Sequence, residues 1–140
     1  MIIQGISAFF ATAAFSILFY IPKKYIIHAG FTGSIGWFIY LLFMRISDDK
    51  VIANFAATLL VTLTAHIMAR KLKTPVTMFL IPGIIPLVPG AGMYQIVLNM
   101  INNTLDEASY YFFETIKMAG AIALGIFIID TLFRSRQRLK

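Results

Sequence analysis

Five apolar segments, separated by short charged connectors, constrain this chain more than any other feature of its sequence. They cover residues 1–21, 29–44, 51–69, 76–101 and 115–133. A helix needs about 20 residues to cross the hydrocarbon core of a bilayer. Of the 140 residues, 59% are hydrophobic and only 13% are charged, and a soluble domain of this size buries only about 70% of its unfolded surface. The sequence therefore predicts a membrane protein.

The spanning segments are expected to be helices. In lipid every backbone N–H and C=O must be paired within the spanning structure, and five short segments cannot close a barrel. We therefore predict an all-α polytopic membrane protein with about five transmembrane helices, forming a single transmembrane domain over residues 1–140. Residues 1–21 have no positive charge ahead of their apolar stretch, so we interpret them as a retained span and not as a signal peptide.

The distribution of basic residues predicts the orientation. If all five segments cross, one side collects nine basic residues and the other two, Arg45 and Lys50. The nine are Lys23, Lys24, Arg70, Lys71, Lys73, Arg134, Arg136, Arg138 and Lys140. Because cytoplasmic loops are enriched in Lys and Arg, we predict an N-terminus outside and a cytoplasmic C-terminus. The alternative has four crossings with both ends inside, because the 16 residues of segment 29–44 rise only about 24 Å as a helix.

The fourth segment is interrupted at its middle. Three prolines and three glycines lie between residues 82 and 92, and each proline is expected to push the residue before it out of the helical region. Pro89 and Gly90 suit a type II turn with a positive φ at Gly90. We predict an unwound stretch that lines a cavity, because non-helical backbone at membrane depth requires protein or water around it. The N–H groups of Gly90 to Met93 would then face an anionic group; a proline-kinked structural helix is the alternative.

Residues 81–94, with the sequence I-P-G-I-I-P-L-V-P-G-A-G-M-Y, resemble the signature of the threonine/serine exporter family, and in particular its small-subunit half. Looser similarity includes F-Y-I-P-K-K at 19–24 and G-S-I-G at 33–36. The resemblance implies proton-coupled export of small amino acids such as threonine and serine, or of short carboxylates such as succinate. It also implies a place in the cytoplasmic (inner) membrane and a larger membrane subunit as partner. A homo-oligomer and a non-transporting scaffold or assembly subunit are the alternatives.

Several residues are candidates for these roles. His66 is a candidate for proton coupling, because histidine titrates near physiological pH, although an interfacial histidine beside Arg70 is the simpler interpretation. Asp130 is expected to pair with Arg134 four residues on, and Lys117 is expected either to pair with Glu114 or to snorkel outward. The candidates for the substrate path are Pro82, Gly83, Pro86, Pro89, Gly90, Gly92, Tyr94, Asn54 and Asn99.

Glycines at every third position of the second segment, Gly30, Gly33 and Gly36, predict a helix-packing face. We expect Gly33 to contribute to association with the larger subunit. No cofactor or metal site is predicted, since the chain has no cysteine and its two histidines lie on different segments. The sequence carries neither a G-x-S-x-G nor an H-E-x-x-H motif, so enzymatic activity is not expected. The basic residues lie in short clusters between apolar runs, which is typical of cytoplasmic loops, so a nucleic-acid partner is not expected either.

Overall fold

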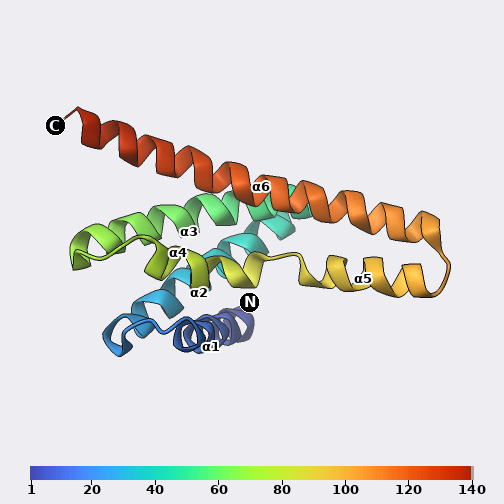
Figure 1. The fold of residues 1–140 in the computed structure, drawn as a ribbon, viewed down its shortest axis with the longest axis horizontal. Helices are drawn as coiled ribbons and strands as arrows, with labels where there is room; N and C mark the ends of the chain where they lie inside the picture. The colour runs from blue at the N-terminus through green and yellow to red at the C-terminus, as the bar shows by residue number, and fades with distance from the viewer. Residues whose placement is uncertain (140) are drawn as a thin grey trace.

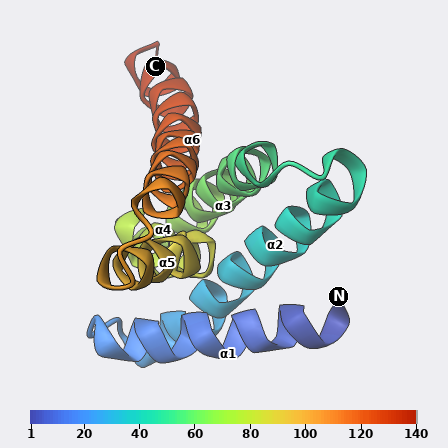
Figure 2. The ribbon, with the colours of Figure 1, turned by 90° about the vertical axis from the view of Figure 1, so that its right-hand side faces the viewer.

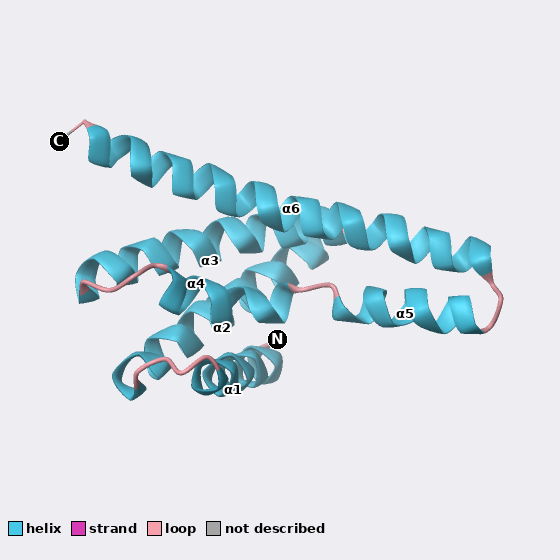
Figure 3. Ribbon diagram, viewed as in Figure 1, coloured by secondary structure: helices cyan, strands magenta, loops and turns pink. Residues whose placement is uncertain are grey.

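The computed structural model describes residues 1–139, and all regular structure in that range is helical. Figures 1 and 3 show the order of the elements along the chain. The helices are α1 (Ile2–Leu18), α2 (Lys23–Ser47), α3 (Lys50–Leu72), α4 (Thr77–Ile84), the short 3₁₀ helix η1 (Ile85–Leu87), α5 (Gly90–Ile101) and α6 (Leu105–Arg138). The predicted all-α class is confirmed.

The lengths of the apolar helices agree with about five transmembrane segments. The helices α2, α3 and α6 are each long and apolar enough to cross a bilayer alone. A fourth candidate span consists of α4 with η1 and then α5, bent by 48° at a short break. The remaining helix, α1, is apolar but has only 17 residues, a rise of about 26 Å.

The second helix is longer than its apolar segment. It has 25 residues and rises about 37 Å, because charged residues extend it at both ends beyond residues 29–44. Pro22 precedes its first turn, and Asp48 ends it in the left-handed conformation with φ 52°. Asp49 then caps α3, accepting a hydrogen bond from the Val51 N–H at 2.8 Å. The four-crossing alternative assumed that segment 29–44 is too short to cross, and the length of α2 removes that reason.

The fourth connector is shorter than expected. Residues 102–114 were predicted to link two spans, but α6 begins at Leu105 and only residues 102–104 lie between the helices. Asp106 and Glu107 occupy the first turn of α6, where negative charge is favoured by the helix dipole. Glu114 therefore lies on a helix and not in a loop.

Helix α6 packs against two other helices, α5 and α3. The first third of α6 runs antiparallel beside α5, and its later turns pack along α3 (Figure 1). In the same view α1 is seen end-on, so its axis is steeply inclined to those of α3 and α6, and Figure 2 shows it crossing α2, against which it packs. The ends of α3 and α6 that carry Arg70, Lys71, Arg136 and Arg138 lie at one end of the molecule (Figure 1). Lys140, counted in the predicted basic side, lies outside the described residues.

Small residues bring the first three helices together. A Cβ added to Gly33 would overlap Thr12 of α1, one added to Gly30 would come within 2.7 Å of Phe9, and one added to Gly36 would overlap Val61 of α3. All three glycines are buried. The glycine face of α2 is therefore covered inside this chain and is not free to contact a second subunit through Gly33, contrary to our expectation.

Candidate functional site

The break in the fourth span lies at one point, not at each proline. Ile81 is inside α4 and Ile85 is helical, with φ −51° and ψ −44°. Only Val88 is extended, with ψ 131°. The expectation that Pro82 and Pro86 unwind the chain is wrong: Pro82 is fully buried among neighbouring helices, which support a proline inside a membrane helix. Pro86 lies in the first turn of η1, where no N–H donor is needed.

The turn before α5 also differs from the one predicted. Pro89 has φ −75° and ψ 57°, and the Gly90 N–H donates to the Val88 carbonyl at 2.7 Å, as in an inverse γ-turn. No glycine has a positive φ, so the predicted type II turn is wrong. The Met93 N–H donates to the Pro89 carbonyl at 3.1 Å. In the described chain this leaves the N–H groups of Ala91 and Gly92 as the unpaired donors at the start of α5.

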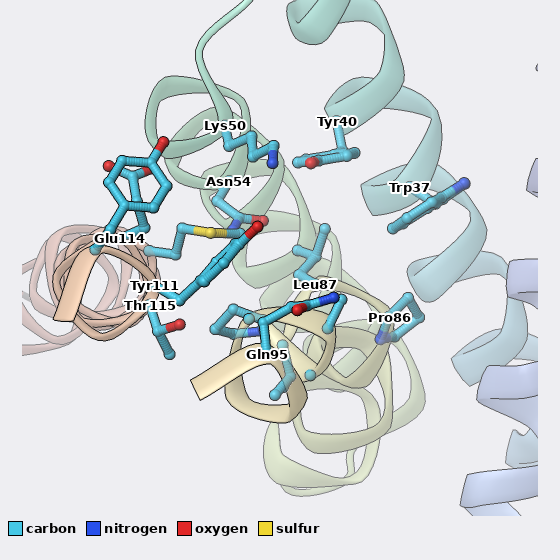
Figure 4. A pocket seen from close by; sticks show the side chains of 17 residues that line it. Trp37, Tyr40, Lys50, Asn54, Pro86, Leu87, Gln95, Tyr111, Glu114 and Thr115 are labelled. Atoms are coloured by element: carbon cyan, nitrogen blue, oxygen red, sulfur yellow. The ribbon is translucent and has the colours of Figure 1, made fainter. Parts of the chain in front are cut away.

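A cavity of about 390 Å³ opens at this helix start. Side chains from α2, α3, η1, α5 and α6 meet around it, and Figure 4 shows Lys50 and Asn54 on one side, with Glu114 and Thr115 on another. Aromatic rings supply much of the wall, from Trp37, Tyr40, Tyr110 and Tyr111. Apolar walls with a few polar groups are typical of small-molecule sites.

Two buried polar side chains in the cavity wall have no partner. Asn54 is 1% exposed, and neither its amide nitrogen nor its amide oxygen makes a hydrogen bond within the described chain. The Thr115 hydroxyl is also buried and unpartnered, and it would lie 2.5 Å from a Cβ on Gly92. Burying an unpaired polar group costs about 1–3 kcal/mol, and a polar molecule or water bonded to these groups would offset that cost.

The structure brings together five of the nine predicted substrate-path residues. Asn54, Pro86, Pro89, Gly90 and Gly92 all line the cavity. The other four lie elsewhere. Gly83 packs against Thr32 and Val61, and Pro82 is buried within α4. Tyr94 is 63% exposed on the outer face of α5.

Asn99, the last of the predicted substrate-path residues that lie outside the cavity, makes hydrogen bonds within the chain. Its side-chain amide donates to the Gln95 carbonyl at 2.8 Å, and its side-chain oxygen accepts from the Thr104 hydroxyl at 2.9 Å. These bonds hold the turn between α5 and α6.

Several residues of the cavity were missed by sequence reasoning. They are Trp37, Tyr40, Lys50, Gln95, Tyr110, Tyr111, Glu114, Thr115 and Met118. Most come from α2 and the first turns of α6, which only the packing of these helices brings near α5. A charged residue directly before an apolar segment, as Lys50 is before 51–69 and Glu114 before 115–133, is the one signal that the sequence offered.

At the far end of α3, His66 lies among charged and aromatic groups of α6. Its Nε2 is 3.4 Å from Asp130 Oδ1, and Arg134 Nε is 2.9 Å from Asp130 Oδ2. The Phe133 ring stacks on His66 at 4.4 Å, and the Arg70 guanidinium lies 4.5 Å from the same ring. The Asp130–Arg134 and Glu114–Lys117 pairs are confirmed. The contact between His66 and Asp130, 64 positions apart, was missed.

Residues 1–139 contain no group of three or more His, Asp or Glu side chains placed to hold a metal ion.

Comparison with known proteins identifies the family. A family profile described as "Threonine/Serine exporter, ThrE" matches residues 4–132. The chain belongs to the threonine/serine exporter family. It is therefore a multi-pass membrane protein of a transporter family, as the resemblance of residues 81–94 predicted.

Two relatives are longer proteins, of which this chain matches only a part. It is 27% identical over 126 residues to a threonine/serine exporter of Corynebacterium glutamicum, a match that covers 90% of this chain and 26% of that protein. It is 26% identical over 128 residues to an uncharacterized protein of Haemophilus influenzae, covering 85% of this chain and 43% of the other. The chain thus spans less than half of the length of either relative. No solved structure matches it.

Proposed function

We propose that this chain is one half of a secondary exporter that moves small amino acids, such as threonine and serine, or short carboxylates out of the cell, and that the cavity at the start of α5 is its substrate site. The observation that carries the proposal is the fully buried Asn54 amide, unpartnered in the wall of a 390 Å³ cavity. At a purely structural position, an apolar side chain would cost less free energy than this unpaired amide. Asn54 is explained if a polar solute binds there.

The start of α5 supplies the second element of the proposed site. A helix N-terminus carries a partial positive charge, and its free N–H groups bind carboxylates without a full charge being placed in the membrane. Ala91 and Gly92 have the free N–H groups here, and the Thr115 hydroxyl lies beside Gly92. Discontinuous helices bind the carboxylates of substrates in this way in other transporters.

The variant Gly92→Val tests the substrate site. A valine at this position would fill the space beside Thr115 and block access to the free N–H groups, so we expect export of serine, threonine and succinate from loaded cells to fall at least tenfold. Gly120→Val is the matched control, because Gly120 lies on α6 outside the cavity lining and a Cβ on it meets nothing within 4 Å. Normal export by Gly92→Val, at membrane levels equal to those of the control, would contradict the proposal and favour the scaffold alternative.

The proposed partner is a larger membrane subunit. The chain covers only 43% and 26% of its two relatives, and large apolar side chains such as Phe112, Phe113 and Phe127 are exposed along α6. We expect crosslinking from Phe113 or Phe127 to recover the larger subunit. Recovery of a second copy of this chain alone would instead support a homo-oligomer.

The proposed driving force is the proton gradient, with His66 as the proton carrier. Four buried polar residues follow one another at every fourth position of α3: Asn54, Thr58, Thr62 and His66. The Thr58 hydroxyl has no partner, and the Thr62 hydroxyl donates to the Thr58 carbonyl at 2.8 Å. This polar row extends about 18 Å from the cavity to the His66–Asp130 pair, which offers a route for coupling the two.

The variant His66→Gln tests the coupling. It keeps a polar side chain of similar length but cannot carry a proton, so we expect uphill export driven by an imposed pH gradient to be lost while downhill exchange of labelled serine persists. His28→Gln is the control, because His28 lies near the start of α2, away from Asp130. Unchanged pH-driven export by His66→Gln would remove His66 from the coupling step.

The proposed orientation places the C-terminus in the cytoplasm of a cell with the exporter in its inner membrane. A topology reporter fused to the C-terminus should report the cytoplasm, and one inserted at Asn103, in the α5–α6 turn, should report the opposite side. The same side for both reporters would show that α4 and α5 form a re-entrant loop.

A further inference from the structure

The mouth of the cavity carries two opposite charges that are not paired with each other. Lys50, Tyr110 and Glu114 line both the 390 Å³ cavity and an adjoining polar hollow of about 610 Å³. These three residues therefore stand where the two spaces meet. In Figure 4, Lys50 and Glu114 enter the cavity wall from two different helices.

Each charge at the mouth is available to a solute. Among residues 1–139, Lys50 has no ion-pair partner, and the ion pair of Glu114 is with Lys117, 3.0 Å away on the same helix. The Lys117 side chain is 60% exposed, and an exposed pair of this kind contributes little free energy. Glu114 can therefore exchange this contact for another cation at small cost.

The polar hollow of about 610 Å³ is lined by more acidic than basic residues. Its lining includes Asp48, Asp49 and Glu114 against Lys50 and Lys117. A dianion entering the hollow would meet more negative than positive groups, whereas a zwitterion would meet both of its counter-charges at the mouth. The buried Asn54 amide and the Thr115 hydroxyl, both unpartnered, lie further inside the same cavity.

We infer that Lys50 and Glu114 form a charge-selective mouth, in which Glu114 binds the ammonium group of an α-amino acid and thereby favours amino acids over dicarboxylates. The inference rests on the proposed substrate site. The carboxylate of the same solute faces the Ala91 and Gly92 N–H groups and the Thr115 hydroxyl, which line the same cavity as Glu114. Glu114 is thus the specificity-determining residue between the two substrate classes that the proposed function leaves open.

Efflux of three related solutes from preloaded cells tests the mouth. L-Serine carries an ammonium group, glycerate carries a hydroxyl in its place, and succinate is a dicarboxylate. In the unaltered protein we expect L-serine efflux to exceed that of glycerate and succinate at least tenfold. In Glu114→Gln we expect L-serine efflux to fall about tenfold and that of glycerate and succinate to stay within twofold or to rise.

The matched control is Lys117→Gln, one turn further along α6 and absent from the inner cavity lining. It frees Glu114 from its present partner, so the preference for L-serine should be kept or strengthened. The inference is overturned if Glu114→Gln leaves the ratio of serine to glycerate unchanged, or if the unaltered protein prefers succinate. If Gly92→Val exports all three solutes normally, the proposed substrate site itself is wrong. If Gly92→Val blocks export but Glu114→Gln leaves the ratio of serine to glycerate unchanged, only the charge-selective mouth is wrong.

Discussion

The glycines of α2 and Gly90, the first residue of α5, lie in opposite environments. A Cβ on Gly33 or Gly36 would overlap a neighbouring helix, whereas one on Gly90 would meet nothing within 4 Å. In α2 the missing side chain lets two backbones approach each other, as is common between membrane helices. At Gly90 it leaves room that no described part of the chain fills. The same residue type therefore serves packing in one region and access to a cavity in the other.

The largest effect is expected where packing is closest. Gly33→Leu would force a side chain into Thr12, and overpacking of a tight contact costs about 1–3 kcal/mol or more. We expect α1 to separate from α2 and the apparent melting temperature in detergent to fall by about 10 °C. Gly120→Leu is the control, because Gly120 is exposed on α6 and has nothing within 4 Å. Equal melting temperatures for the two variants would show that the α1–α2 contact is not stabilising.

The comparison can be sharpened at two asparagines that are both buried, with exposed fractions of 1% for Asn54 and 7% for Asn99, but differ in their hydrogen bonds. Asn54 has no hydrogen-bond partner, whereas Asn99 bonds to Gln95 and Thr104. Asn54→Leu removes an unpaired amide, so we expect it to raise stability by about 1 kcal/mol while export falls at least tenfold. Asn99→Leu should lower stability by about 1–3 kcal/mol. Thermal unfolding and efflux, measured on both variants, check the pair; loss of stability in Asn54→Leu would indicate that Asn54 is structural.

A smaller effect is expected at the edge of the cavity. Pro86 lies in the first turn of η1 and lines the cavity. Pro86→Ala adds an N–H donor and relaxes the turn, so the free energy of unfolding should change by less than about 1 kcal/mol. We expect export to fall about threefold, because the start of α5 would shift relative to Asn54. Amide hydrogen exchange at Ala91 and Gly92 would report that shift, and unchanged exchange together with unchanged export would place Pro86 outside the site.

The amino-acid sequence alone determined that this is a helical membrane protein with a break in its fourth span. Both properties depend on local composition: apolar runs about 20 residues long favour lipid, and a proline removes a backbone donor wherever it stands. The I-P-G-I-I-P-L-V-P-G-A-G-M-Y run at 81–94 also carried the family resemblance, which the family profile confirmed.

The tertiary structure decided which of these residues act together. Lys50 and Glu114 are 64 positions apart in the sequence, as are His66 and Asp130. The first two line one cavity and the second two are in contact only because α6 packs along α3. It also decided that Pro82 stays helical and that the glycine face of α2 is covered by α1. The physical reason is that lipid burial and backbone pairing are set segment by segment, whereas a cavity forms where side chains of separate helices fail to fill the space between them.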